Sequence, residues 1–273
     1  MMAHEKASGG MDNLVRGLAS HFREPASIED WHWAMSLNQA RAVALGIEHW
    51  RSLGPDMLVW QLNDCWPVIS WSALDSEGRR KPLWYALRKS FQDRLLTIQP
   101  RNDRLVVVAV NDSADPWSGP PTWSAVIFRV RVLAQATASL HAAPSDIHLI
   151  PLSSDVANAG DPLSEVLVVS CGPDRALWFF GEDRDLSLPR HDLETSIEPV
   201  EGGWLVRVRA AALQRDVVLL ADKVGPDAVV DEMLLTLLAG EPAVIRIQGR
   251  GIADVRCLVS PKVLRSANQP VSM

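Results

Sequence analysis

The period of the apolar residues changes near residue 93, and this change restricts the chain to two kinds of structure in succession. Over residues 30–51 the apolar side chains recur at spacings of three and four, which predicts one buried helix face. Over residues 126–132, 204–209 and 245–248 they alternate with residues that are mostly arginine, which predicts strands with one buried face. The sequence therefore predicts a helical part that is followed by an all-β part.

Local signals subdivide the helical part. Ser27 and Asp30 have the spacing of a helix N-terminal capping pair, Pro82 suits the first turn of another helix, and residues 75–78 are typical of a turn. Residues 57–62 form a short apolar run between turn residues, which predicts a buried strand. One strand with its helices cannot complete a barrel or an open sheet, so we interpret this part as the end of a larger structure. We expect it to dock on the first β-sandwich and to be the less stable half.

The β part contains short apolar runs that are separated by Gly, Pro, Asp and Asn, a pattern typical of antiparallel sandwiches. Its length suits two such sandwiches, and the polar segment at residues 189–191 marks a junction between them. The predicted domains are therefore residues 1–92, a β-sandwich at 93–190 and a C-terminal sandwich at 191–273. We expect both sandwiches to be Ig-like.

Composition limits the class of protein. The chain is 47% hydrophobic and 22% charged, as in ordinary globular domains and unlike disordered chains. It carries a net charge of −6 with no basic block, so nucleic acid is not an expected partner. No apolar run reaches the length of a membrane span, and the first residues lack the apolar core of a signal peptide, which favours a cytoplasmic location.

The cysteines and histidines predict no special chemistry. Cys65, Cys171 and Cys257 stand far apart and form no C-x-x-C pair, which favours reduced thiols. Cys65 is interpreted as a small packed residue. The histidines have no metal-ligand spacing, so we expect neither a metal nor another cofactor.

The segment from Trp60 to Ser72 holds the densest set of candidate functional residues. It reads W-Q-L-N-D-C-W-P-V-I-S-W-S and follows the predicted strand. In parallel α/β structures the carboxyl ends of strands face the active site, and indole faces with Asn and Asp side chains suit a sugar. The residue types alone also fit a second interpretation, in which the tryptophans are core and Asn63 and Asp64 cap a turn.

The same segment, continued to Ala86, resembles the end of the catalytic barrel in β-mannosidases of glycoside hydrolase family 2, where W-Q-L-N-D-x-W-P forms the last barrel strand and its loop. Residues 4–10 and 48–51 resemble the family's segments just upstream, and segments from Val110 to Asp222 resemble its C-terminal sandwiches. The resemblance implies a multidomain fold of mixed α/β and all-β parts. Residues 1–92 are then the terminal segment of a (β/α)8 TIM barrel, followed by the two Ig-like sandwiches.

The resemblance implies retaining hydrolysis by two carboxyl groups, which the family supplies from an Asn-Glu pair and from a Ser-Glu-aromatic-Gly motif. This sequence has no Asn-Glu pair, and neither Ser76-Glu77 nor Ser164-Glu165 is followed by an aromatic residue and glycine. No catalytic residue is therefore assigned to it. Four residues match the family's sugar-binding motif position by position: Trp60, Asn63, Asp64 and Trp66.

Three hypotheses follow. The first is the C-terminal portion of a β-mannosidase, whose partners are a β-mannoside oligosaccharide and the missing N-terminal portion of the same enzyme. The second is a non-catalytic β-sandwich module that binds carbohydrate or protein. Trp117 and Trp123 are interpreted mainly as core or loop-packing residues, and sugar contacts on such a module are the alternative. The third is an inert remnant of a truncated gene.

Overall fold

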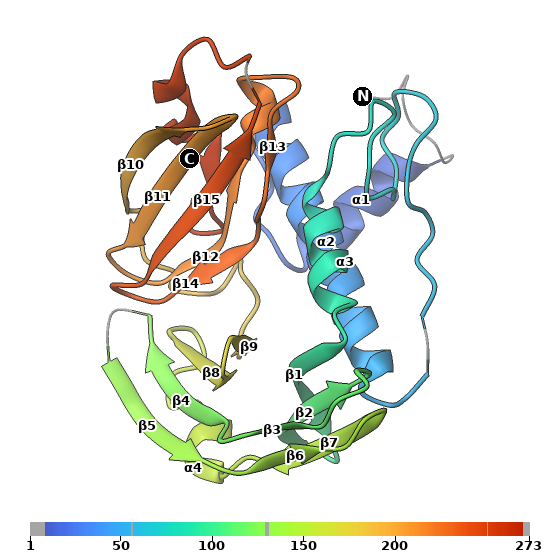
Figure 1. Ribbon diagram of the computed structural model, residues 1–273, viewed down its shortest axis with the longest axis vertical. Helices are drawn as coiled ribbons and strands as arrows, with labels where there is room; N and C mark the ends of the chain where they lie inside the picture. Colours follow the sequence, from blue (N-terminus) through green and yellow to red (C-terminus); the bar gives the residue numbers. More distant parts are fainter. Residues whose placement is uncertain (1–8, 56, 129–130, 250, 270–273) are drawn as a thin grey trace. The chain divides into compact units, whose positions relative to one another are not determined.

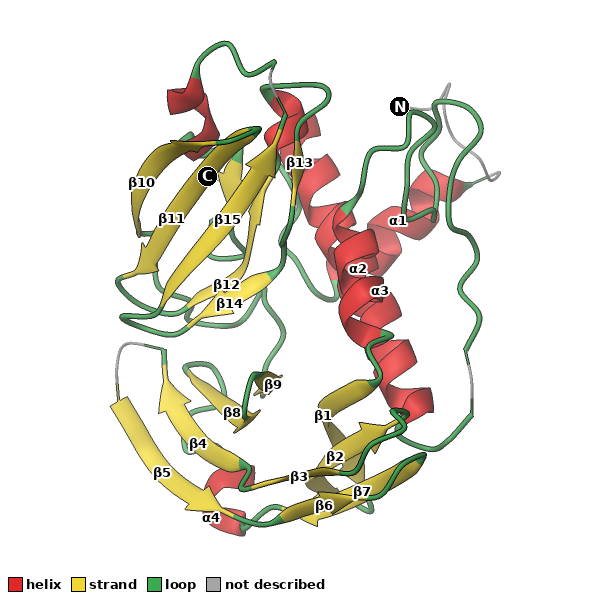
Figure 2. Ribbon diagram, viewed as in Figure 1, coloured by secondary structure: helices red, strands yellow, loops and turns green. Residues whose placement is uncertain are grey.

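A computed structural model of the 273-residue chain describes residues 9–55, 57–128, 131–249 and 251–269. The fold is mixed and consists largely of antiparallel β-sheets with a few helices (Figures 1 and 2). The helices are α1 (Gly10–Ala19), α2 (Ile28–Arg51), α3 (Pro82–Ser90) and α4 (Ser154–Ala157), with 3-10 helices η2 (Ala221–Lys223) and η3 (Val255–Val259). None of these described helices is long and apolar enough to span a membrane. Of the segments quoted for the resemblance, residues 4–8 lie outside the described ranges.

The described residues divide into two compact units, and neither unit is continuous in sequence. The first draws on Met1–Ala40, Trp60–Ala86 and Leu188–Met273, and the second on Arg41–Val59 and Leu87–Ser187. Helices α2 and α3 each contribute residues to both units. The change from the second unit to the first at Leu188 lies beside the predicted junction at 189–191.

The first unit contains two antiparallel sheets that share one core. One sheet has the strand order β10-β11-β15-β13 and the other β14-β12-β16. Their strands are β10 (Leu193–Val200), β11 (Gly203–Ala210), β12 (Gln214–Leu219), β13 (Val229–Val230), β14 (Leu235–Leu237), β15 (Pro242–Gln248) and β16 (Leu264–Arg265). In β11 and β15 buried aliphatic residues alternate with exposed polar ones, so both predicted alternating strands are confirmed.

The core of the first unit also includes the N-terminal helices. Its buried members include Leu18 of α1, Trp33 and Leu37 of α2, Tyr85 of α3, Val206 and Val208 of β11, Val217 to Leu219 of β12, and Ile245 and Ile247 of β15. The prediction that residues 1–91 dock on the first sandwich is therefore wrong for α1, for the start of α2 and for residues 60–86. These segments pack into one core with the C-terminal sheets, because the apolar face of α2 covers the inner side chains of those strands.

The second unit is a separate set of antiparallel sheets, ordered β1-β2-β7, β3-β6 and β5-β4-β8-β9. Its strands are β1 (Arg94–Arg101), β2 (Arg104–Asn111), β3 (Trp117–Gly119), β4 (Thr122–Ile127), β5 (Arg131–Thr137), β6 (Leu140–Ala142), β7 (Asp146–Pro151), β8 (Glu165–Cys171) and β9 (Asp174–Phe179). Trp117 and Trp123 belong to its core, each 4% exposed. They are therefore not surface groups that contact a sugar, and the predicted packing role is confirmed.

The predicted starts of two helices are confirmed in detail. The Ser27 hydroxyl accepts a hydrogen bond from the Asp30 backbone N–H at 3.1 Å and donates one to the Asp30 carboxylate at 2.6 Å. This satisfies a donor that would otherwise be free in the first turn of α2. Helix α3 begins at Pro82, where the missing N–H removes no helical hydrogen bond.

Two strand predictions are wrong. Residues 57–62 form no strand, and Leu58 is 97% exposed. A strand requires a neighbouring backbone for its hydrogen bonds, and none of the described sheets includes this segment. The run 126–132 is not one strand either: it contains the end of β4 and the start of β5, which pair at Val126↔Val132 and Ile127↔Arg131. Val126 and Phe128 are buried on the first arm of this hairpin, whereas Val132 on the second arm is 55% exposed, so the run does not present one continuous buried face.

The second unit contains a half-buried glutamate, Glu48, whose carboxyl group is hydrogen-bonded within the fold. Thr97 Oγ1 donates a hydrogen bond to Glu48 Oε2 at 2.8 Å, and Gln99 Nε2 donates one to Thr97 Oγ1 at 3.0 Å. Burial raises the pKa of Glu48 above its ordinary 4.5, although the Thr97 hydrogen bond and the charges of Lys89 and Arg51 act against this. The folded state therefore favours the protonated carboxyl more than the unfolded state does.

Glu48→Gln is expected to raise the Tm of the second unit by a few degrees at pH 8 and to leave it unchanged at pH 4. Because the folded pKa is raised, the wild-type chain loses stability as the pH rises from about 4.5 through the folded pKa, and the neutral amide removes this loss. Thermal unfolding at both pH values measures the effect. The control is Glu194→Gln, at an exposed position of β10. An equal gain at both pH values would contradict the protonation argument.

Candidate functional site

The candidate site is the loop from Trp60 to Lys81, which lies entirely within the first unit. Hydrogen bonds between backbone groups of the loop fold its second half back on its first half. Leu74 N–H donates to Leu62 O at 2.8 Å, Asp64 N–H donates to Leu74 O at 3.1 Å, and Lys81 N–H donates to Ala73 O at 3.0 Å. Bridges at Asn63↔Leu74 and Leu74↔Arg80 follow from these bonds. The segment of the resemblance is therefore a compact loop that leads into α3.

The predicted turn closes the far end of this loop. The Asp75 carboxylate accepts hydrogen bonds from the N–H groups of Glu77 and Arg79, both at 2.9 Å. Gly78 has a φ of 79°, in the left-handed region that favours glycine. The Asx geometry and the glycine together set the direction in which the chain enters Lys81 and α3.

Asp64 is the centre of the loop and is 3% exposed. The Ser70 hydroxyl lies 2.7 Å from its Oδ1 and 2.6 Å from its Oδ2. The Ser72 hydroxyl also contacts Oδ2, and Lys81 Nζ lies 3.3 Å from Oδ2 and 2.7 Å from Ser72 Oγ. We call Asp64, Ser70, Ser72 and Lys81 the Asp64 cluster.

The cluster keeps the Asp64 carboxylate ionised. Burial alone raises the pKa of a carboxyl group. Here the hydrogen bonds from Ser70 and Ser72 and the positive charge of Lys81 outweigh burial and hold the pKa of Asp64 below its ordinary value. A buried carboxylate with several donors is suited to holding the loop in one conformation, and it is a poor proton acceptor at neutral pH.

The other three predicted site residues lie at the surface. The exposed fraction is 76% for Trp60 and 42% for Trp66, and Asn63 is also exposed. Trp71, in the same loop, is 40% exposed. The structure thus brings the four predicted residues into one loop, in which Asp64 is buried and Asn63 and the two indoles are exposed. That any of them contacts a sugar remains a prediction.

Sequence reasoning missed the partners of Asp64. Ser70, Ser72 and Lys81 follow it by six, eight and seventeen residues, and no periodic pattern joins them. Cys65 was expected to be packed, and this expectation is wrong, because Cys65 is exposed. All three cysteines are free thiols, as predicted.

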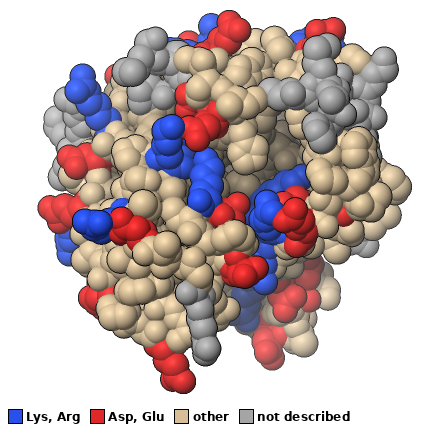
Figure 3. Space-filling model, turned by 90° about the horizontal axis from the view of Figure 1, so that it is seen from above, with Lys and Arg blue, Asp and Glu red and all other residues tan. Residues whose placement is uncertain are grey.

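The loop can present indole faces and an amide to a ligand, but it cannot perform retaining hydrolysis by itself. That reaction requires two carboxyl groups about 5–5.5 Å apart, and in this loop the carboxylates of Asp75 and Glu77 are engaged in the turn and with Arg79. Among the described residues no group of three His, Cys, Asp or Glu side chains could hold a metal ion. Charges of both signs are interspersed over the face seen in Figure 3, with no extended patch of one sign.

Comparison with known proteins identifies relatives of one part of the chain. Over 92 residues it is 34% identical to β-mannosidase B of Aspergillus niger and, equally, to that of Aspergillus terreus. This stretch covers 32% of the chain and 11% of the fungal enzymes, so the chain spans only a small part of the relatives that it matches. The chain is thus homologous to part of a family 2 β-mannosidase. No protein-family model matches it.

The whole fold also occurs in solved structures. A β-D-mannosidase from Dictyoglomus thermophilum superposes with a TM-score of 0.84 at 24% identity, over 100% of this chain and 34% of that one. An exo-chitosanase from Amycolatopsis orientalis superposes with a TM-score of 0.69 at 14% identity, over 98% of this chain and 37% of that one. At these identities the likeness concerns the fold, which occurs in enzymes with different names.

Proposed function

We propose that this chain, which is homologous to part of a family 2 β-mannosidase, forms the C-terminal portion of such an enzyme. The complete enzyme hydrolyses non-reducing-end β-D-mannosides with retention. Residues up to 92 provide the end of its catalytic barrel, and the two sets of sheets are its C-terminal domains. The chain contributes part of the sugar subsite and neither catalytic glutamate.

The 34% identity over 92 residues carries this proposal. The fold supports the family but does not select the sugar, because an exo-chitosanase has the same architecture. The choice of mannose therefore depends on the sequence match. The exposed apolar side chains of one loop, Trp60, Leu62, Trp66 and Trp71, support the fragment interpretation, because apolar groups exposed together are typical of surfaces that bind a ligand or another part of a protein.

In the proposed enzyme the residues of the loop have different roles. Trp60 and Trp66 offer apolar faces to the pyranose ring, and Asn63 offers an amide to its hydroxyls. Asp64 is a positioning residue that holds the loop through Ser70, Ser72 and Lys81. Leu58, which is exposed in this chain, lies in the segment that completes the barrel once neighbouring strands pair with it.

The purified chain is expected to have no activity on an aryl β-mannoside, even at high protein concentration. A longer polypeptide, encoded in frame upstream and carrying Asn-Glu and Ser-Glu-aromatic-Gly, is expected to be active. The reason is that retaining hydrolysis requires both carboxyl groups. The release of the aryl alcohol measures the activity of the chain and of the longer polypeptide. Turnover by the chain alone that disappears in Asp64→Asn would contradict the proposal, as would an inactive, well-folded longer polypeptide.

Trp60→Ala in the longer polypeptide is expected to lower kcat/KM by about ten- to hundredfold, which corresponds to the loss of about 1–3 kcal/mol of transition-state binding. Its stability should not change, because the indole is mostly exposed. The matched control is Phe91→Ala, at an exposed aromatic residue that follows α3. A Trp60→Ala enzyme with wild-type kcat/KM would remove Trp60 from the subsite.

A further inference from the structure

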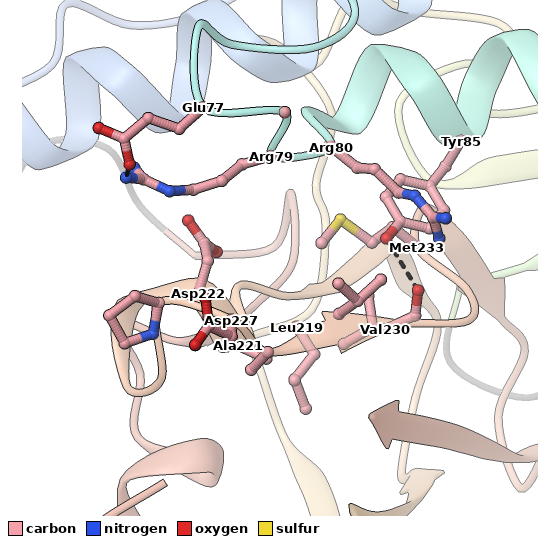
Figure 4. Close-up of a pocket in the computed structure, with 14 residues that line it drawn as sticks. Glu77, Arg79, Arg80, Tyr85, Leu219, Ala221, Asp222, Asp227, Val230 and Met233 are labelled. Atoms are coloured by element: carbon pink, nitrogen blue, oxygen red, sulfur yellow. Dashed lines mark hydrogen bonds and ion pairs between the residues drawn. The ribbon is translucent and has the colours of Figure 1, made fainter. Parts of the chain in front are cut away.

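A pocket of about 240 Å³ lies within the first unit, between the turn that precedes α3 and the loops that follow β12 (Figure 4). Its floor is apolar and consists of the buried side chains of Leu219, Val230 and Met233. Charged side chains surround this floor, with Arg80 on one side and Asp222 and Asp227 on the other. The pocket is not part of the Asp64 cluster.

The wall next to Arg80 is held in place. Tyr85 OH donates a hydrogen bond to Val230 O at 2.9 Å, which ties α3 to β13 across the base of the pocket (Figure 4). The Arg80 guanidinium carbon lies 4.2 Å from the centroid of the Trp84 ring, at the distance of a cation–π contact. The guanidinium is thus oriented by an aromatic face, which leaves its N–H groups available.

The charged groups of the pocket differ in whether they are satisfied. Glu77 pairs with Arg79, so these two charges neutralise one another. By contrast, within the described residues no hydrogen bond or ion pair engages the guanidinium of Arg80 or the carboxylates of Asp222 and Asp227. The N–H donors of Arg80 and the carboxylate acceptors of Asp222 and Asp227 therefore line a small space above the apolar floor.

This combination suits a neutral polyhydroxylated ligand, which can bond to groups of both signs. An anion is repelled by the two carboxylates, and a cation attracted by them leaves the Arg80 guanidinium without an acceptor. Hydroxyl groups suit both kinds of wall, because they donate to carboxylates and accept from guanidinium. The volume corresponds to about eight water molecules at roughly 30 Å³ each, which suits one sugar ring and not a chain of several.

We propose that this pocket binds one neutral monosaccharide unit, with its hydroxyls on Arg80, Asp222 and Asp227 and its C–H face on Met233. The choice of a mannosyl unit rests on the proposed function, whereas the class of ligand rests on the pocket itself. A single ring with few contacts and an open side binds in the millimolar range.

The test is a titration of the full chain, labelled with [methyl-13C]methionine, with methyl β-D-mannoside. The Met233 methyl signal, assigned with Met233→Leu, is expected to shift and to saturate. Asp222→Ala and Arg80→Gln are each expected to weaken binding about tenfold, because each removes hydrogen bonds to the sugar. The matched control is Glu201→Ala, which removes a carboxylate from the exposed turn between β10 and β11 and should leave the affinity within about twofold.

Three outcomes overturn the proposal: no saturable shift of Met233 up to about 100 mM sugar, the same affinity in Asp222→Ala as in the wild type, or a shift with putrescine or inorganic phosphate and none with the mannoside. This test is independent of the hydrolysis assay. An active longer polypeptide with an unresponsive Met233 rejects the pocket alone. Sugar binding here, together with an inactive, well-folded longer polypeptide, rejects the proposed enzyme alone.

Discussion

Asp64→Ala is expected to lower the free energy of unfolding of the first unit by about 3–5 kcal/mol, the usual cost of removing one partner of a buried ion pair. The substitution leaves Lys81 Nζ without its carboxylate and removes the common acceptor of Ser70 and Ser72. The loop from Trp60 to Lys81 should then lose its fixed conformation. Urea denaturation and hydrogen exchange at the Leu74 and Lys81 amides measure the two effects.

Two further variants test the origin of this loss. Lys81→Met retains the aliphatic stem and removes the charge, so it should also destabilise the unit, while Trp60→Ala in the same loop should not. Because the pKa of Asp64 is depressed in the folded state, its contribution is present above the unfolded pKa of about 3.8 and is lost as the pH falls through the folded pKa. A stable, fully ordered Asp64→Ala chain would show that the carboxylate serves a ligand and not the loop.

Trp33→Ala is expected to cost about 3–5 kcal/mol, the typical loss for truncating a buried tryptophan to alanine. Trp33 is 2% exposed and belongs to the same core as β11, β12 and β15, and its ring lies 5.3 Å from the Arg265 guanidinium carbon. Arg265 also donates to Asp30 at 2.8 Å, so the start of α2 is joined to β16 by both apolar and charged contacts. Chemical denaturation with hydrogen exchange in β11 and β15 measures the loss.

The matched control for this prediction is Trp50→Ala, because Trp50 lies on the same helix but is about half exposed. Its effect should remain within about 0.5 kcal/mol. If Trp33→Ala lowered protection in α2 while β11 and β15 kept theirs, the helix would be a separately docked element, as the sequence alone suggested. A common loss in helix and strands is the result expected from a shared core.

The elements that the sequence determined are those whose causes are local. Ser27 and Asp30 bond to one another within a single turn, and Pro82 acts through its own ring, so both helix starts could be predicted. The alternation in β11 and β15 records one buried face within each strand. The residues from Trp60 to Ala86 likewise pointed to β-mannosidases without any knowledge of the fold, and the sequence match supports this family.

The tertiary structure alone decided everything that depends on a distant partner. Residues 57–62 have the composition of a strand, but a strand exists only where another backbone accepts and donates its hydrogen bonds. Trp117 and Trp123 were expected to pack, but only the sheets that surround them show which core they enter. Ser70, Ser72 and Lys81 reach the Asp64 carboxylate only in the folded loop, and no pattern in the sequence marks them as its partners. Local chemistry determines what a residue is able to do, and the side chains that the fold brings to it determine which of those roles remains.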